Sequence, residues 1–270
     1  MRYAISCSVR FPIALATTVF LLPALSLMAG VNPPGFPPFP TGEFQPAGLS
    51  PKEPEIVVEY PGGAITRGIA KGNAVVSVLI DASGKASDAL VIGCTDLSFG
   101  KKLLDQVAAI EFQAAKFKGV AVPARYELGY TFESMRTEVN PMDAARQRME
   151  KATGVKLVYS AVAEKELDHP LEFTNAALPQ LPEGYPVVDQ NLVKVFVTFY
   201  VDENGHVRVP NVESAASSQL IPGAIAAVLQ WSFKPPQAKG KPALVFVGRA
   251  VRFVPRQSAR VEARGIALSE

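Results

Sequence analysis

Two stretches of the chain show the same order of hydrophobic and polar positions, at an offset of 121 residues. Residues 73–132 align without a gap on residues 194–253, so that turns fall on turns and apolar runs fall on apolar runs. A repeat of this kind predicts two structural units of one design. The identical pairs are Val76/Val197, Asp81/Asp202, Gly84/Gly205, Val91/Val212, Val107/Val228, Phe112/Phe233, Lys118/Lys239, Gly119/Gly240 and Phe132/Phe253.

Each copy opens with a predicted β-hairpin. A β-branched run, 74–80 or 195–201, leads into Asp-x-x-Gly at 81–84 or 202–205, and a second apolar run follows. The aspartate can accept hydrogen bonds from the amides of the turn, and the glycine can adopt a positive φ. This order of residues is therefore typical of two strands joined by a tight turn.

A helix is predicted after each hairpin, because apolar residues recur there with helical spacing. Ser218 is the expected N-cap of the second helix, and Pro222 is accommodated in its first turn. Phe112 and Phe233 are expected to end the helices and to pin them to the sheets. The apolar stripes are Leu103, Leu104, Val107 and Ile110 in the first copy, and Ile221, Ile225, Val228 and Leu229 in the second.

A strand with alternating sides closes each copy, from 122 to 132 and from 243 to 253. Arg249 interrupts the apolar side of the second closing strand. The order strand, strand, helix, strand predicts an α+β fold made of two ββαβ modules. Each module is expected to be a small antiparallel sheet with one helix packed on one face.

The rest of the chain is arranged around these two modules. The Pro-rich stretch before the first module favours an extended form of about 3.1 Å per residue, which gives a reach of roughly 75 Å. The expected organisation is a signal peptide or anchor at 1–29, a Pro-rich linker at 30–54, a first module at 55–137, a connecting helix at 138–158, a second module at 159–255 and a flexible tail at 256–270.

The N-terminus has the features of an export signal. Arg2 and Arg10 precede an apolar run at 11–29, and small residues near its end suit a signal peptidase. The alternative is an uncleaved anchor, because a run of this length can just span a bilayer. We therefore expect a periplasmic or secreted protein, anchored in the inner membrane if residues 11–29 are retained, with no other membrane contact.

Cys94 is the only thiol left if the signal, which contains Cys7, is removed. It is interpreted as a small buried hydrophobic residue, with a disulfide between two copies as the alternative.

Charge and composition exclude several classes of function. The chain has 27 Lys and Arg against 25 Asp and Glu, and the excess disappears without Arg2 and Arg10, so nucleic acid is not an expected partner. His169 and His206 are the only histidines and lie far apart in sequence, which disfavours a metal site. No nucleophile elbow, Walker loop or dinucleotide motif is present. We expect no catalytic residues, no cofactor and no metal.

Taken together, these residues resemble the C-terminal domain of TonB proteins. The shared features are a Tyr-Pro pair before each copy (Tyr60-Pro61 and Tyr185-Pro186), the Asp-x-x-Gly hairpin, a helix that leads to Phe, a Lys-Gly loop and a strand that closes on Phe. The helix exit Trp231-Ser232-Phe233-Lys234-Pro235 matches especially well, whereas Ile110-Glu111-Phe112-Gln113-Ala114 departs from the pattern.

The resemblance implies a periplasmic module that binds an extended peptide of an outer-membrane transport protein by adding it to the edge of a sheet. One alternative is a membrane-anchored energy transducer. Residues 11–29 contain no ionisable group to couple to a motor, and the linker is short for crossing the periplasm. A structural scaffold of the cell envelope is a further alternative.

In that family the peptide adds to the closing strand, which places the candidate site here. The second copy is favoured because residues 244–251 contain no proline, and Val247→Pro is expected to remove a donor from the edge. The partner is then a protein or peptide of the cell envelope, with an outer-membrane receptor as the leading case. A homodimer through Cys94 or through sheet edges is an alternative assembly. The candidate edge residues are Val245, Val247, Arg249 and Val251 in the second copy, and Arg125 and Glu127 in the first.

Overall fold

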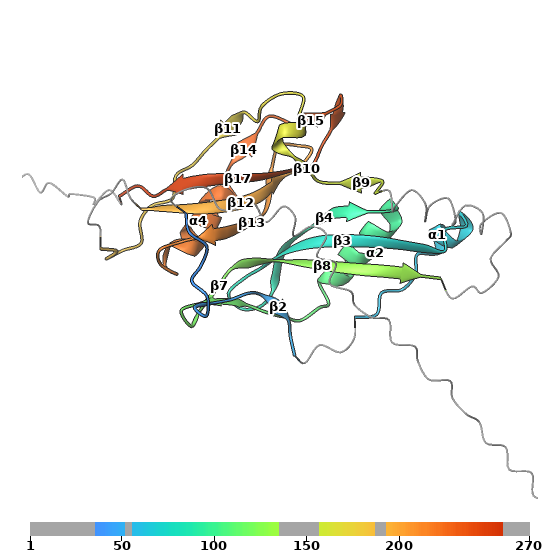
Figure 1. Cartoon of the computed structure of the whole chain (residues 1–270), viewed down its shortest axis with the longest axis horizontal. Helices are drawn as coiled ribbons and strands as arrows, with labels where there is room; N and C mark the ends of the chain where they lie inside the picture. Colours follow the sequence, from blue (N-terminus) through green and yellow to red (C-terminus); the bar gives the residue numbers. More distant parts are fainter. Residues whose placement is uncertain (1–35, 52–55, 135–156, 187–192, 256–270) are drawn as a thin grey trace, which may run out of the picture.

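The computed structural model describes residues 36–51, 56–134, 157–186 and 193–255. Over these residues the protein is a mixed α+β fold, with more strand than helix and several small sheets that are mainly antiparallel (Figure 1). The predicted α+β class is therefore confirmed. The signal or anchor, the expected flexible tail and nearly all of the expected connecting helix lie outside the described residues.

The first large sheet has the strand order β8-β3-β4-β9 and is antiparallel throughout. Its strands are β3 (Lys71–Ile80), β4 (Ala86–Cys94), β8 (Ala124–Glu133) and β9 (Tyr159–Ser160). Helix α2 (Leu97–Val107) packs on one face, where Phe99 stacks on Phe132 with ring centroids 4.7 Å apart. This sheet contains the first predicted hairpin.

The second large sheet has the order β10-β17-β12-β13. It consists of β10 (Val162–Ala163), β12 (Lys194–Val201), β13 (Val207–Ser214) and β17 (Val245–Arg252), and helix α4 (Leu220–Val228) packs on one face. The pairing of β10 with β17 is parallel, and the other pairings are antiparallel. Strands β12 and β13 form the second predicted hairpin.

The helix starts differ in how they are capped. Asp96 caps α2, because its side chain accepts a hydrogen bond from the Ser98 amide. Ser218 is not the N-cap of α4, and that prediction is wrong: Gln219 occupies the N-cap position and makes no side-chain capping bond. Pro222 is the third residue of α4 and lies in its first turn, where its missing amide costs nothing.

The two phenylalanines expected to end the helices lie instead in short strands that follow the helices. Strand β5 (Phe112–Gln113) pairs with β2 (Gly48–Leu49), and β14 (Ser232–Phe233) pairs with β11 (Phe173–Asn175). Both phenylalanines are buried, as expected. In both halves of the chain, a segment upstream of the large sheet therefore pairs with the exit of the helix.

Part of the expected Pro-rich linker is folded onto the first half of the protein. Strand β1 (Phe44–Gln45) pairs with β6 (Ala115–Phe117), which in turn pairs with β7 (Val120–Val122). Phe39 stacks on Phe44 at 4.6 Å between ring centroids. An extended spacer over the whole of residues 30–54 therefore does not describe residues 36–51. The remaining small elements are α1 (Gly62–Thr66), the 3-10 turn η2 (Glu164–Glu166), β15 (Gln237–Ala238) and β16 (Lys241–Pro242).

One short segment contributes to both large sheets. Strand β9 pairs with β4 at the edge of the first sheet, and β10, one residue further on, pairs with β17 at the edge of the second. The sequence-based boundary assigns residue 159 and all that follows to the second module, whereas β9 belongs to the first sheet. Tyr159 strengthens the connection, since its hydroxyl donates to Glu203 at 2.6 Å.

The faces of the two sheets that carry no helix meet each other. Ser77 and Leu79 lie on the face of β3 opposite α2 and are buried, and Tyr200 is buried on the face of β12 opposite α4. Strand β13 contacts β3, β4 and β8. Two ion pairs join the sheets: Asp88 of the first sheet accepts from Arg208 of the second, and Arg125 of the first pairs with Glu213 of the second.

Candidate functional site

In β17, the amide and carbonyl groups of even-numbered residues point away from β12, towards the outer edge of the sheet. Val162 N donates to Leu244 O on the outer side at 2.9 Å, and Phe253 N donates to Val193 O on the side of β12 at 3.1 Å. Because backbone groups alternate along an antiparallel strand, Gly248 and Ala250 face outward and Val247 faces β12. The expectation that Val247→Pro would remove an edge donor is therefore wrong.

Most of the candidate side chains of β17 belong to the core. Val245, Val247 and Val251 are at most 1% exposed, on the face covered by α4. These three residues can hold the strand in place, but their side chains cannot contact an added peptide without unpacking the core.

The outer edge of β17 is occupied at both ends. Strand β10 pairs with Val245 and Phe246, and beyond the other end Val254 N donates to Pro179 O while Leu181 N donates to Val254 O. Between these two ends, Arg249 pairs with Glu164 at 2.5 Å, and its Nη1 donates to Gly248 O at 2.9 Å, so this outward carbonyl already has a donor. Among the described residues, only a short interval around Ala250 has no strand partner on this outer side.

The closing strand of the first sheet has a longer open edge. Ser134 N donates to Ala70 O on the side of β3, so odd-numbered residues of β8 face outward. No strand in the described part of the chain pairs with that outer side. The outward groups of Glu127, Gly129 and Thr131 form a ladder site that contains no proline.

Arg125 marks where this open edge begins. Its amide donates to Asn211 Oδ1 at 3.0 Å, so the second sheet occupies the edge at that residue. The guanidinium lies over the rings of Tyr200 and Phe246, 5.6 and 5.1 Å from their centroids, and Nη2 is 3.3 Å from Glu213 Oε1. Arg125 is therefore a contact between the sheets, whereas the Glu127 carboxylate remains partly exposed.

A shallow apolar groove of about 270 Å³ runs between α2 and the β4–β9 edge. Cys94 lies at its base, is fully buried, and has a thiol pKa raised by burial. A disulfide between two copies would require the residues that cover Cys94 to move apart. The groove is lined by Leu90, Val91, Cys94, Leu97, Gly100, Lys101, Leu104 and Tyr159.

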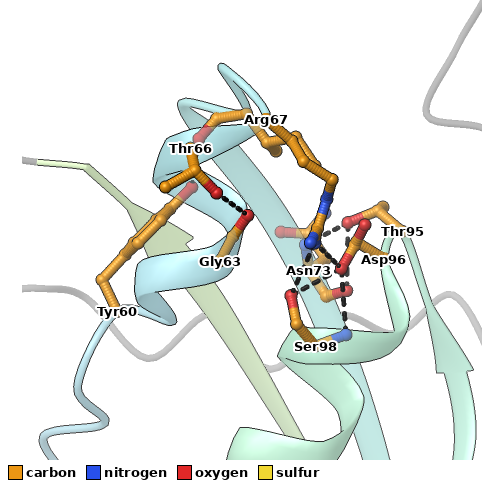
Figure 2. Close-up of polar contacts among 9 residues, drawn as sticks. Tyr60, Gly63, Thr66, Arg67, Asn73, Thr95, Asp96 and Ser98 are labelled. Atoms are coloured by element: carbon orange, nitrogen blue, oxygen red, sulfur yellow. Dashed lines mark hydrogen bonds and ion pairs between the residues drawn. The ribbon is translucent and has the colours of Figure 1, made fainter.

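A polar cluster at the start of α2 is structural in character (Figure 2). Figure 2 shows Arg67 reaching from the end of α1 to Asp96 and Ser98, at 2.7 and 3.2 Å. Burial raises the pKa of Asp96, but the hydrogen bonds from Ser98 and the charge of Arg67 outweigh it and hold the pKa below its usual value. The signal for this cap was in the sequence, since an aspartate directly precedes the helix.

We predict that Asp96→Ala lowers the free energy of unfolding by about 1 kcal/mol at neutral pH, through loss of the helix cap. The folded-state pKa of Asp96 is depressed, so its contribution is present above the unfolded value near 3.8 and is lost as pH falls through the folded pKa. Urea titrations at neutral and acidic pH measure the difference. Asp96→Asn, which retains a capping oxygen, should lose less, and equal losses for both variants would contradict a capping role.

The other polar residues considered from the sequence are not brought together. Asp81 and Asp202 each accept hydrogen bonds from the amides of their own turn. His169 and His206 lie in separate loops. Over the described ranges, no group of His, Cys, Asp and Glu is arranged to hold a metal ion, and no helix there has the length and apolar character needed to cross a membrane.

No family model, curated protein or solved structure matches this chain.

Proposed function

We propose that the protein is a periplasmic binding module of the TonB C-terminal type, built from two ββαβ units. It would bind extended peptides of outer-membrane transport proteins by β-strand addition and catalyse no reaction. Support comes from the order of elements, since β3, β4, α2 and β8 are followed by β12, β13, α4 and β17 in the same succession. The resemblance in sequence follows the same order.

The observation that carries the proposal is the open edge of β8. The outer side of β8, from Glu127 to Thr131, presents backbone donors and acceptors to which a peptide can add, and alternating side chains provide selectivity. The edge of β17 is a weaker candidate, because β10 and residues 179–181 already pair at its ends. The first closing strand therefore replaces the second as the favoured site.

Proline substitution at outward-facing amides tests this proposal. Thr131→Pro removes an outward donor of β8 without breaking the ladder to β3, and Ala250→Pro does the same on β17. We expect Thr131→Pro to reduce the capture of an outer-membrane receptor from an envelope extract at least tenfold. Ala250→Pro should leave capture near the wild-type level.

Circular dichroism and the urea midpoint establish that both variants are folded. Loss of capture with Ala250→Pro alone would move the site to β17. Unchanged capture with both variants would refute strand addition at either closing strand.

A further inference from the structure

We propose that Glu127 makes the β8 edge selective for an extended peptide with a cationic side chain opposite this residue. The inference rests on the proposed function and names the chemistry of the partner. It arises from an imbalance between two carboxylates that share one guanidinium.

Glu213 and Glu127 both lie beside Arg125, and they are satisfied to different degrees. Glu213 Oε1 accepts from Thr198 at 2.6 Å and from Asn211 at 2.9 Å, and Arg125 Nη2 is 3.3 Å away. Among the described residues, Glu127 has only a long hydrogen bond from the Tyr200 hydroxyl, at 3.4 Å, and Arg125 Nε at 4.0 Å.

Arg125 is therefore committed to Glu213, and the charge of Glu127 is only weakly compensated. Burial raises the pKa of Tyr200, so its hydroxyl stays protonated and supplies a dipole instead of a charge. In the described part of the chain, Arg125 is the only cation within ion-pair distance of Glu127. The Glu127 side chain is 36% exposed and accessible to an incoming group.

The position of Glu127 on the strand makes this charge selective. Its amide and carbonyl face outward, so an added strand places one residue directly opposite, with a side chain on the same face as the carboxylate. Asn211 holds the preceding outward amide, at Arg125, and Glu127 is therefore the first position of the ladder that a partner can use. A lysine or arginine opposite Glu127 would complete the pairing that Arg125 leaves unfinished.

Binding of short acetylated peptides to the purified protein tests the inference. The probes alternate threonine and valine and differ only at one central position, which holds lysine, glutamine or glutamate. Fluorescence anisotropy should rank them lysine, glutamine, glutamate in order of affinity, with about a two- to fivefold change at each step and a smaller spread at high salt. Glu127→Gln should remove the ranking.

Glu133→Gln is the matched control, because Glu133 lies on the same strand and face but is paired with Lys71 at 2.5 Å. This variant should keep the wild-type ranking. Equal affinity for the three peptides, or a ranking that survives Glu127→Gln, would overturn the selectivity while leaving strand addition intact. Failure of every peptide to bind would overturn both the selectivity and the proposed edge.

Discussion

Gly205→Ala is expected to lower the free energy of unfolding by about 3–4 kcal/mol, one of the largest effects of a single methyl group in this protein. Gly205 has φ of +85°, where an L side chain is strained, and an added Cβ would lie 2.0 Å from the carbonyl oxygen of Phe233. The backbone cannot withdraw easily, because Phe233 N donates to Gly205 O at 2.8 Å. Both the backbone strain and the steric clash would therefore lower the free energy of unfolding.

Two other glycines separate the strain from the clash. Gly240 also has positive φ, at +70°, but an added Cβ meets nothing within 4 Å, so Gly240→Ala should cost about 1–2 kcal/mol from conformation alone. Gly84 occupies the position of Gly205 in the first hairpin, with 2.7 Å to Phe112 O, and should give an intermediate loss. Urea unfolding followed by the fluorescence of Trp231, the single tryptophan, provides the measurement. Equal losses at Gly205 and Gly240 would show that the close contact contributes nothing.

These glycines show what the sequence predicts well. Asp-x-x-Gly between two apolar runs predicts a tight turn with positive φ, because local hydrogen bonding and sterics decide it. The sequence also predicts the helices that follow and the burial of Phe112 and Phe233. It does not predict that each turn glycine touches the carbonyl of that phenylalanine, since the contact depends on how the helix exit returns to the hairpin.

The candidate site was predicted less well, for a related reason. Alternation along β17 correctly separates its two faces, but it does not say which residues point their amides toward β12. That parity is set by register, and register placed Val247 inward and Ala250 outward. The sequence does not predict that β10 covers one end of the outer edge of β17. Residues 162–163 form too short a strand to give a periodic signal, and their partner is about 80 residues away.

Sequence patterns also do not predict the contact between the two sheets at Asp88 and Val209. Asp88 and Val209 are equivalent positions of the two repeats, yet their roles differ: the Val209 amide donates a hydrogen bond to the Asp88 carboxylate. Val209 has φ of +46°, in a stretch of β13 where the register with β12 shifts. A β-branched residue rarely adopts this conformation, so neither copy of the repeat predicts it.

We expect Asp88→Ala to destabilise the protein by about 2–3 kcal/mol through loss of this contact. The Asp88 carboxylate accepts from Arg208 Nε and Nη2, at 3.1 and 2.6 Å, and from Val209 N at 3.0 Å. Val209 is fully buried, so removing the acceptor leaves its amide without a partner and leaves a half-buried guanidinium poorly compensated. The strained φ of Val209 then loses the hydrogen bond that joins its amide to the first sheet.

Comparison with an exposed ion pair makes this prediction specific. Glu133→Ala removes the partner of Lys71, but both side chains are more than half exposed, and the expected loss is at most about 1 kcal/mol. A double-mutant cycle of Asp88→Ala with Arg208→Ala should show coupling, because the two residues share one contact. If Asp88→Ala cost no more than Glu133→Ala in urea unfolding, the bulge of β13 would be held by packing alone. A large, coupled loss would instead mean that one carboxylate on the first sheet holds the strained conformation of the second.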